Sequence, residues 1–188
     1  MDQPRLQTLA EIEAALWHEL SLAPRDKAHA WRTPVLATTD GEVADARTVV
    51  LREVDRSERR LTIYSDSRAA KVAHLQARPL GSLVLWSRRL SWQLRLRVHL
   101  QAETEGLAVT SRWALLKVSP TAQDYLSPLA PGVPLPGQKD ETPPAAGAER
   151  GYLAVITATV LSVDWLELHP AGHRRARFSE GQGVWLTP

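Results

Sequence analysis

Two neighbouring segments of the sequence place cationic side chains beside small hydroxyl side chains. Arg47 lies in the stretch ADARTVVLREVD, and Arg68 and Lys71 follow Ser65 in the stretch LTIYSDSRAAK. Few carboxylates stand at these points, so we expect the positive charges to be available to an anion. A planar guanidinium matches the oxygens of a phosphate, and the N-terminus of a helix offers unpaired N–H groups to the same ligand. The cluster predicts a phosphate cradle, although ordinary surface cations beside a loop would give the same pattern.

The first segment is expected to lie on a β-hairpin, and the second at the end of a neighbouring strand. Residues 33–55 read as two strands around the pair Asp40-Gly41, since an Asp-Gly pair tolerates the positive φ angles of a tight turn. Residues 60–65 form a third strand, rich in β-branched and aromatic side chains. The spacing of apolar residues then predicts a short helix over residues 68–76. The cations of the second cluster therefore stand where a strand gives way to a helix.

A second hairpin carries polar side chains that could meet a flat ring. Its strands are residues 80–87 and 90–104, on either side of a turn with two arginines. Apolar residues alternate in the second strand with polar ones, among them Gln93 and Arg95, so one face is apolar and the other cationic. An amide both donates and accepts hydrogen bonds, which suits the edge of a heteroaromatic ring. A solvated sheet face explains Gln93 and Arg95 equally well.

The remaining segments predict two more helices, a long loop and a long strand. A stripe of leucine and isoleucine with intervening glutamates predicts an amphipathic helix over about residues 5–21. Residues 107–118 read as another helix. The prolines and glycines that follow exclude a continuous helix or a central strand, so residues 127–150 are expected to be a loop. Residues 152–168 are expected to form a long buried strand.

Hairpins join most of the predicted strands, and this decides the fold class. A last hairpin is predicted around Glu180-Gly181. The alternation of strands and helices that builds a doubly wound sheet is missing. We therefore expect a mainly β fold with flanking helices, in which about six antiparallel strands form a closed or partly closed barrel. A chain of 188 residues can bury one substantial core, so a single domain over residues 1–188 is the simplest division.

Composition excludes several classes of protein and of site. The 23 Lys and Arg residues against 21 Asp and Glu leave a net charge of +2, which gives little support to a nucleic-acid or membrane-surface role. The lack of cysteine excludes thiolate chemistry, and the six histidines show no metal-ligand spacing. No glycine-rich phosphate loop and no nucleophile elbow is present. The N-terminal residues lack the apolar run of a signal or membrane helix, so a cytoplasmic protein is expected.

Taken in order, these motifs resemble the pyridoxamine 5′-phosphate oxidase-like, FMN-binding split-barrel family. The matching pieces are LATTDGEVADARTVVLREVD, LTIYSDSRAAKVAHLQARP, LVLW…SWQLRLRV, YLSPLAPGVPLPG and VDWLELHPAGHRRARFSEGQGVWLTP. The resemblance implies an antiparallel six-stranded split β-barrel and a homodimer with an FMN site at its interface. It also implies oxidoreductase activity on a small molecule, in which the flavin supplies the redox chemistry. The anion of the cationic cluster would then be the flavin phosphate.

The resemblance also assigns roles to individual residues. The residues that it places at the FMN phosphate are Arg47, Arg68, Lys71 and Ser65, the last beside Tyr64. The residues whose backbone would run along the isoalloxazine ring are Thr48, Val49, Val50 and Leu51. Gln93 would bond the polar edge of the ring. Trp165 and Arg177 would reach a flavin bound mainly by the other subunit.

One departure from the family pattern concerns the substrate. The vitamin B6 enzymes carry an Arg-x-His segment near the C-terminus that grips the substrate, whereas this sequence has Arg174, Arg175 and Ala176. Arg174 and Arg175 are candidate contacts for some other anionic substrate, and the chain resembles an uncharacterised branch of the family. Two alternatives stay open: a flavin-binding module without turnover, and a split barrel that uses a deazaflavin or haem.

Overall fold

The structure is a computed structural model that describes residues 5–135 and 151–188. Its helices are α1 (Leu9–Leu22), α2 (Ala70–Ala77) and α3 (Leu107–Leu116), with two short 3-10 helices, η1 (Ala30–Arg32) and η2 (Pro120–Tyr125). Its strands are β1 (Val35–Thr39), β2 (Ala44–Thr48), β3 (Leu51–Asp55), β4 (Arg60–Asp66), β5 (Leu80–Ser87), β6 (Trp92–Glu103), β7 (Leu153–Glu167), β8 (Arg174–Ser179) and β9 (Gln182–Leu186). The mainly β fold with flanking helices is confirmed.

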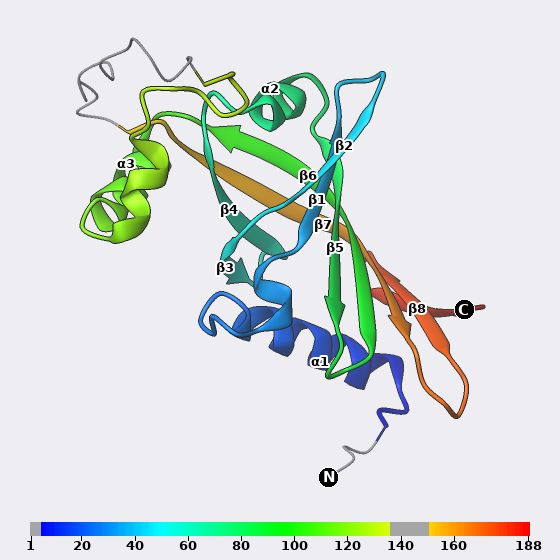
Figure 1. Cartoon of the computed structure of the whole chain (residues 1–188). Coiled ribbons are helices and arrows are strands. Elements are labelled where there is room, and N and C mark those ends of the chain that lie inside the picture. Colours follow the sequence, from blue (N-terminus) through cyan, green and yellow to red (C-terminus); the bar gives the residue numbers. More distant parts are fainter. Residues whose placement is uncertain (1–4, 136–150) are drawn as a thin grey trace.

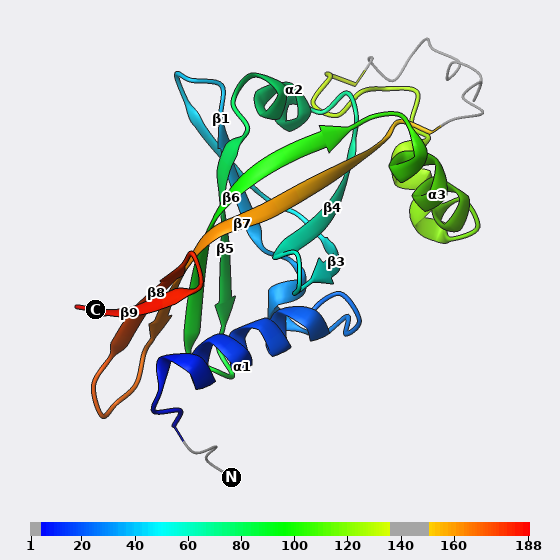
Figure 2. The same cartoon turned by 180° about the vertical axis from the view of Figure 1, so that it is seen from behind.

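The strands of the described residues form one antiparallel sheet that curls into a split barrel (Figures 1 and 2). The order along the main path is β2-β1-β5-β6-β7-β4-β3, and β8 and β9 continue from β7 as an extra hairpin. The two edge strands of the path, β2 and β3, are consecutive in the chain, with only Val49 and Val50 between them. The sheet must therefore bend until its two edges face each other. We call this junction, residues 48–51, the seam.

The number of strands corrects the prediction of six. The stretch predicted as one strand after Asp40-Gly41 forms two strands, β2 and β3, because the chain leaves the β1 ladder at the seam and joins the β4 ladder. The C-terminal hairpin lies outside the main path and adds two more strands. Hydrophobic alternation identifies a strand but does not reveal a change of partner along it.

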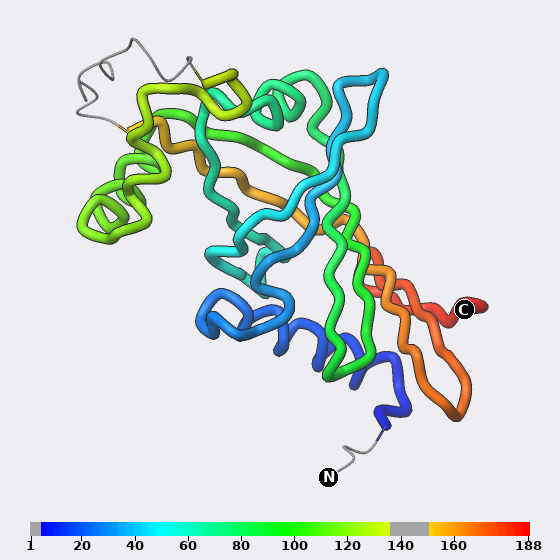
Figure 3. The backbone as a smooth tube through the Cα atoms, in the orientation of Figure 1, coloured from blue at the N-terminus to red at the C-terminus, as the bar shows by residue number. Residues whose placement is uncertain are grey.

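The core fills the barrel and extends to α1. Along α1, Ile12, Leu16 and Leu20 are fully buried, as the predicted stripe requires. The helix begins with a capping box, in which the Thr8 hydroxyl accepts from the Glu11 backbone and the Glu11 carboxylate accepts from the Thr8 backbone. Figure 3 shows α1 crossing one end of the barrel, at the opposite end from α2. The two ends of the molecule therefore differ, and the predicted phosphate residues lie at the α2 end.

The predicted turns are also present. The β8–β9 hairpin closes with Glu180 and Gly181, both at positive φ, as a two-residue turn that follows the twist of its strands requires. After Asp40, Gly41 has φ 111°, and the Asp40 carboxylate accepts the N–H groups of Glu42 and Val43. Of the predicted 127–150 loop, residues 127–135 are described, and the rest of the prediction lies outside the described residues.

Candidate flavin phosphate site

Two cations and a buried hydroxyl meet where β2, β4 and α2 come together. Lys71, in the first turn of α2, donates from Nζ to Ser65 Oγ at 3.0 Å, and Ser65 is a buried residue of β4. Arg47 reaches from β2 across β1 and donates from Nη1 to Thr38 Oγ1 at 2.7 Å. Burial, and then the nearby Arg47 charge, lower the pKa of Lys71. We call Arg47, Ser65 and Lys71 the anion corner.

The two arginines that were predicted to bind a phosphate form ion pairs with carboxylates, although the sequence predicted positive charges free for an anion. Arg47 forms an ion pair with Asp45, and Arg68 forms one with Asp66 at 2.7 Å. Asp45 and Arg47 stand two apart on one strand, so their side chains share a face of the sheet. That spacing was a usable signal in the sequence. Among the described residues, Lys71 has no carboxylate within ion-pair distance.

Arg68 does not point into the anion corner. Its guanidinium donates from Nε and Nη2 to the Asp66 carboxylate, at 3.0 and 2.7 Å. The same group donates to the backbone carbonyls of residues 127–129 and lies 3.3 Å from the centroid of the Tyr152 ring. The sequence prediction of a phosphate contact for Arg68 therefore does not fit this structure.

The Tyr64 side chain is also directed away from the corner. Successive residues of a strand face opposite sides of a sheet, so Tyr64 and Ser65 point in opposite directions. The Tyr64 hydroxyl donates to Glu53 at 3.2 Å. Burial, and then the Glu53 charge, raise the pKa of Tyr64 to about 12. Only the backbone of Tyr64 is left to face a ligand at the corner.

The seam lies next to Arg47 in the sequence and passes over the core. Val49 and Leu51 are buried, Thr48 is exposed and Val50 is intermediate. The Val49 N–H donates to the Pro34 carbonyl at 2.9 Å, which fixes the backbone at the point where it leaves β2. The predicted ring-binding backbone is thus an anchored segment at the surface of the barrel.

The face of the sheet that points away from the core carries Gln93 and several of the predicted C-terminal residues. Its members come from neighbouring strands: Val35, Val84, Trp86, Gln93, Arg95, Asp164, Leu166, Arg175, Arg177 and Val184. We call these residues the outer face. Trp86 and Val184 are 45% and 48% exposed. Trp86 and Leu166 stand opposite Gln93 on the two neighbouring strands, so apolar side chains flank the amide that was predicted to bond the flavin ring.

The candidate substrate residues are both paired with carboxylates. Arg175 donates to Asp164 from Nη2 at 2.7 Å, and Arg95 binds the same carboxylate at 2.8 Å. Arg174 donates to Glu167 from Nε at 2.9 Å. Burial raises the pKa of Glu167, but hydrogen bonds from Arg174 and Arg5 outweigh it and hold this pKa below the usual range. Arg174 and Arg175 are therefore held by carboxylates, but each carboxylate is shared with a second arginine, so each group keeps one positive charge in excess.

Trp165 and Arg177 occupy different environments, although the prediction paired them. Trp165 is fully buried and packs edge-to-face on Trp92 and Trp185, with ring centroids 5.4 and 6.4 Å away. Its side chain lies inside the core of its own chain, so the burial of Trp165 gives no support to the predicted contact with a flavin on another subunit. Arg177 is exposed on the outer face, opposite Asp164 in the β7–β8 register.

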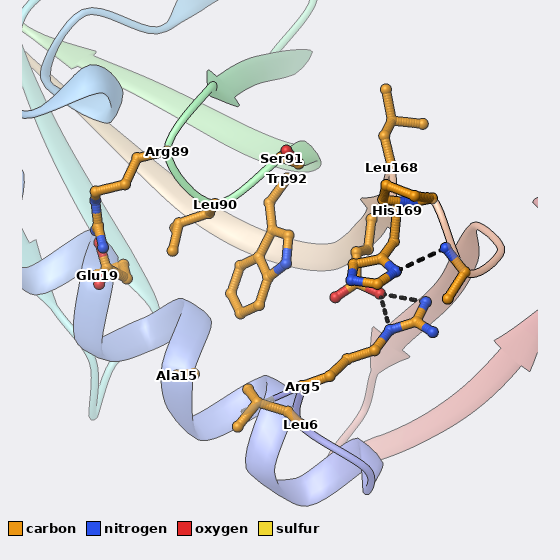
Figure 4. Close-up of a pocket in the computed structure, with 13 residues that line it drawn as sticks. Arg5, Leu6, Ala15, Glu19, Arg89, Leu90, Ser91, Trp92, Leu168 and His169 are labelled. Atoms are coloured by element: carbon orange, nitrogen blue, oxygen red, sulfur yellow. Dashed lines mark hydrogen bonds and ion pairs between the residues drawn. The ribbon is translucent and has the colours of Figure 1, made fainter. Parts of the chain in front are cut away.

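A cavity of about 820 Å³ lies at the α1 end of the barrel (Figure 4). Leu6, Leu90 and Trp92 give it an apolar wall. Its two carboxylates are already bound: Glu167 accepts from Arg5 at 2.7 Å, and Glu19 pairs with Arg89. The cavity is separate from the anion corner at the α2 end, and sequence patterns did not indicate it because its wall comes from three distant segments.

The barrel, its anion corner and its outer face define a split-barrel protein in which two cations lie close to a buried hydroxyl. Residues 12–103 match the family described as pyridoxamine 5′-phosphate oxidase, FMN-binding domain. The predicted resemblance to the pyridoxamine 5′-phosphate oxidase-like family is therefore confirmed for these residues. Comparison with curated proteins gave no match.

Solved structures of related fold extend the similarity to nearly the whole chain. A pyridoxamine 5′-phosphate oxidase-related, FMN-binding protein from Nostoc punctiforme is 21% identical, with a TM-score of 0.72 and coverage of 97% of this chain and 100% of that one. PhzG from Burkholderia lata, solved with tetrahydrophenazine-1-carboxylic acid, is 14% identical, with a TM-score of 0.69 and coverage of 100% and 95%. The general stress protein 26 of Bacillus anthracis is more distant, at 10% identity, a TM-score of 0.52 and coverage of 91% and 98%. At these identities the likeness concerns the fold.

The described part of the chain also bears on membranes and metals. None of its helices has the length and apolar character needed to cross a membrane. No group of three or more His, Asp or Glu side chains in residues 5–135 and 151–188 is arranged to hold a metal ion.

Proposed function

We propose that this chain is an FMN-binding flavoprotein and that the anion corner holds the phosphate of the cofactor. The observation that carries the proposal is the bond of Lys71 to the buried Ser65 hydroxyl, with the charge of Arg47 close enough to act on Lys71. Two cations repel each other in a half-buried corner, and an anion bound between them removes that repulsion. The family match of residues 12–103 supports a flavin nucleotide as the source of the anion.

The rest of the cofactor would follow the seam. In this proposal the isoalloxazine ring lies against the backbone of residues 48–51, and Gln93 supplies donors and acceptors to its polar edge. The described residues fit an aromatic ring there, because the seam has an anchored backbone and adjoins apolar side chains of the outer face, Thr48 standing opposite Val35 and Val35 opposite Val84. Arg47 belongs to the phosphate site and directly precedes the seam in the sequence, so the proposed phosphate and ring sites are adjacent in the chain.

We also propose a twofold homodimer in which the outer face is covered by a second copy. Exposed Trp86 and Val184 flank a row of charged and polar side chains, and such a mixture of aromatic, apolar and arginine residues is typical of interfaces. Exposed Arg177 would then reach the flavin of the partner, as the family resemblance implies. Trp165 is left out of this site because it is buried within its own chain.

The proposed activity is FMN-dependent oxidoreduction of a small molecule. The bound flavin supplies the electron transfer, and the chain binds and orients the cofactor and shields it from water. Pyridoxamine 5′-phosphate is a poor fit as substrate, because Ala176 stands where the family pattern has a histidine, and Arg174 and Arg175 are held in ion pairs with Glu167 and Asp164. The same pairing favours flavin binding without turnover as a second candidate. Air reoxidation of the reduced flavin that no added substrate affects would support that second candidate.

A binding comparison tests the proposed cofactor site. The purified chain is titrated with FMN and with riboflavin, which shares the ring but lacks the phosphate, and flavin fluorescence is followed. We expect FMN to bind at least tenfold more tightly, since one charge-assisted contact contributes about 1.5–3 kcal/mol. Equal affinities would reject the phosphate site, and a haem or deazaflavin absorption spectrum in the purified protein would reject FMN.

The lowered pKa of Lys71 predicts a pH dependence of this preference. Lys71 holds a phosphate only as an ammonium, so the preference for FMN over riboflavin is full below its pKa and declines above it. The decline should begin below the ordinary lysine value of about 10.4. The ratio of the two affinities is measured against pH, which cancels titration of the shared ring. In Lys71→Arg the decline should vanish, because arginine stays protonated; an identical decline would assign it to another group.

The stability of the unliganded protein should depend on pH in the opposite sense to its affinity for FMN. A lysine pKa that is lower in the folded state than in the unfolded state means that the unfolded chain binds more protons between the two values. Over this pH range we therefore expect the stability of the apo-protein to rise, and its affinity for FMN to fall, as the pH increases. Both trends follow if the protonated form of Lys71 favours FMN binding and disfavours folding.

A further inference from the structure

Arg68 makes more contacts than its neighbours at the α2 end, and none of them is with the anion corner. Its Nη1 donates to the Pro128 carbonyl at 3.2 Å, and its Nη2 donates to the Ser127 and Leu129 carbonyls at 2.9 and 3.3 Å. The guanidinium also lies over the Tyr152 ring. Ser127 and Tyr152 stand on the two sides of the proline-rich loop, so one side chain contacts both of its ends.

Asp66 fixes the guanidinium in this position. Its carboxylate accepts from Arg68 Nε and Nη2 and from the Arg68 backbone N–H at 2.8 Å. The Asp66 side chain is only 6% exposed, whereas that of Arg68 is 23% exposed. A buried carboxylate that loses its partner is costly, so the pair holds Arg68 away from any ligand at the corner. Backbone bonds support the same junction, since Ser67 donates to the Tyr152 carbonyl and Tyr152 to the Tyr125 carbonyl.

The junction borders the anion corner directly. Asp66 follows Ser65 in β4, and Arg68 precedes Lys71 at the start of α2. Figures 1 and 2 both show the described part of the loop, in yellow, beside α2. A shift of residues 127–129 would therefore change the surroundings of Lys71 without removing any donor from the corner.

We infer that Arg68 is a positioning residue that joins the two ends of the proline-rich loop and holds them against α2, while the phosphate is left to the anion corner. The effect on flavin binding that we expect from this inference rests on the proposed function. Loss of Arg68 should leave the preference for FMN over riboflavin nearly unchanged, because the anion corner keeps all of its donors. Loss of a phosphate ligand should instead weaken FMN and spare riboflavin.

The test compares Arg68→Ala, Arg68→Lys and Lys71→Ala in the full chain. We expect Arg68→Ala to keep the ratio of the FMN and riboflavin affinities within about twofold of the unmutated value. Lys71→Ala should reduce the ratio at least tenfold. A fall of the ratio in Arg68→Ala comparable to that of Lys71→Ala would overturn the inference.

Limited proteolysis of the unliganded chain gives a second readout that does not depend on flavin. A protease selective for apolar residues is used, and cuts within residues 126–135 are located by mass spectrometry. Cleavage there should be several-fold faster in Arg68→Ala, and equally fast in Arg68→Lys, because one ammonium cannot replace a planar group with five donors. Lys71→Ala should cleave like the unmutated chain. Unchanged cleavage in Arg68→Ala would overturn the inference, whereas an unmutated chain without FMN preference would count against the proposed function alone.

Discussion

Replacing Lys71 by alanine is expected to weaken FMN binding roughly tenfold to a hundredfold, and Arg47→Ala should have an effect of similar size. Each substitution removes a charged donor to the phosphate, and hydrogen bonds to charged groups contribute about 1.5–3 kcal/mol. Riboflavin should bind both variants nearly as well as it binds the unmutated chain. The measurement is the pair of dissociation constants for each variant, obtained by fluorescence titration at fixed ionic strength.

Arg60→Ala is the matched control for this experiment. Arg60 begins β4, the strand that carries Ser65, and it forms an exposed ion pair with Glu58 at 2.9 Å. The substitution changes the net charge by the same amount, so it accounts for long-range attraction of the phosphate. FMN affinity should be nearly unaffected. If Arg60→Ala weakens FMN as much as Lys71→Ala does, the general charge of the chain and not the anion corner governs binding.

Thermal unfolding of the apo-proteins separates binding from folding. Lys71 is charged in a half-buried place and gives up hydration there, so Lys71→Ala should leave the unfolding temperature unchanged or slightly higher. Arg47→Ala also removes bonds to Thr38 and Asp45, and a modest decrease is expected. If both variants are unfolded at ambient temperature, Lys71 and Arg47 are needed for folding, and the anion site must lie elsewhere.

Much of the fold could be predicted from the sequence because its signals are local. The α1 stripe, the alternation in β6 and the Glu180-Gly181 turn each reflect a period or a backbone angle set by adjacent residues. The split between β2 and β3 could not be seen, since the apolar residues Val49, Val50 and Leu51 follow one another across the seam without a turn residue. Only the pairing partners change there, and pairing is a long-range property.

The candidate site was predictable in part, for a similar reason. Lys71 and Ser65 are separated by one strand end and one helix start, so their meeting follows from local geometry. Asp66, the ion-pair partner of Arg68, is two residues away, but the backbone carbonyls that Arg68 binds lie about 60 residues away in sequence, in a loop without periodicity. An arginine pattern beside a helix start cannot distinguish a phosphate ligand from a side chain that binds backbone carbonyls. The direction of a long side chain depends on tertiary neighbours that the local sequence does not specify.

Trp165→Ala is expected to lower the free energy of unfolding by about 3–5 kcal/mol, the usual cost of removing a large aromatic side chain from a core. Trp165 is fully buried between Trp92 and Trp185, and the Arg174 guanidinium lies 5.7 Å from its ring. Since domains are stable by only about 5–15 kcal/mol, this loss is a large fraction of the total. Urea unfolding at fixed protein concentration measures it. Leu115→Ala, which truncates a side chain on a residue that is 77% exposed, should change stability by about 0.5 kcal/mol or less.

Trp165→Phe distinguishes a core residue from a flavin contact. Phenylalanine keeps most of the aromatic packing, and the lost indole Nε1 has no hydrogen-bond partner among the described residues. The variant should therefore fold, with a smaller loss of stability than Trp165→Ala, and bind FMN with unchanged affinity. A direct contact with the flavin of a partner subunit, as the family resemblance implies, would instead weaken FMN binding in a well-folded Trp165→Phe protein. In that case the tryptophan would have to leave the core when the dimer forms, and the assignment of Trp165 to the interior of its own chain would be wrong.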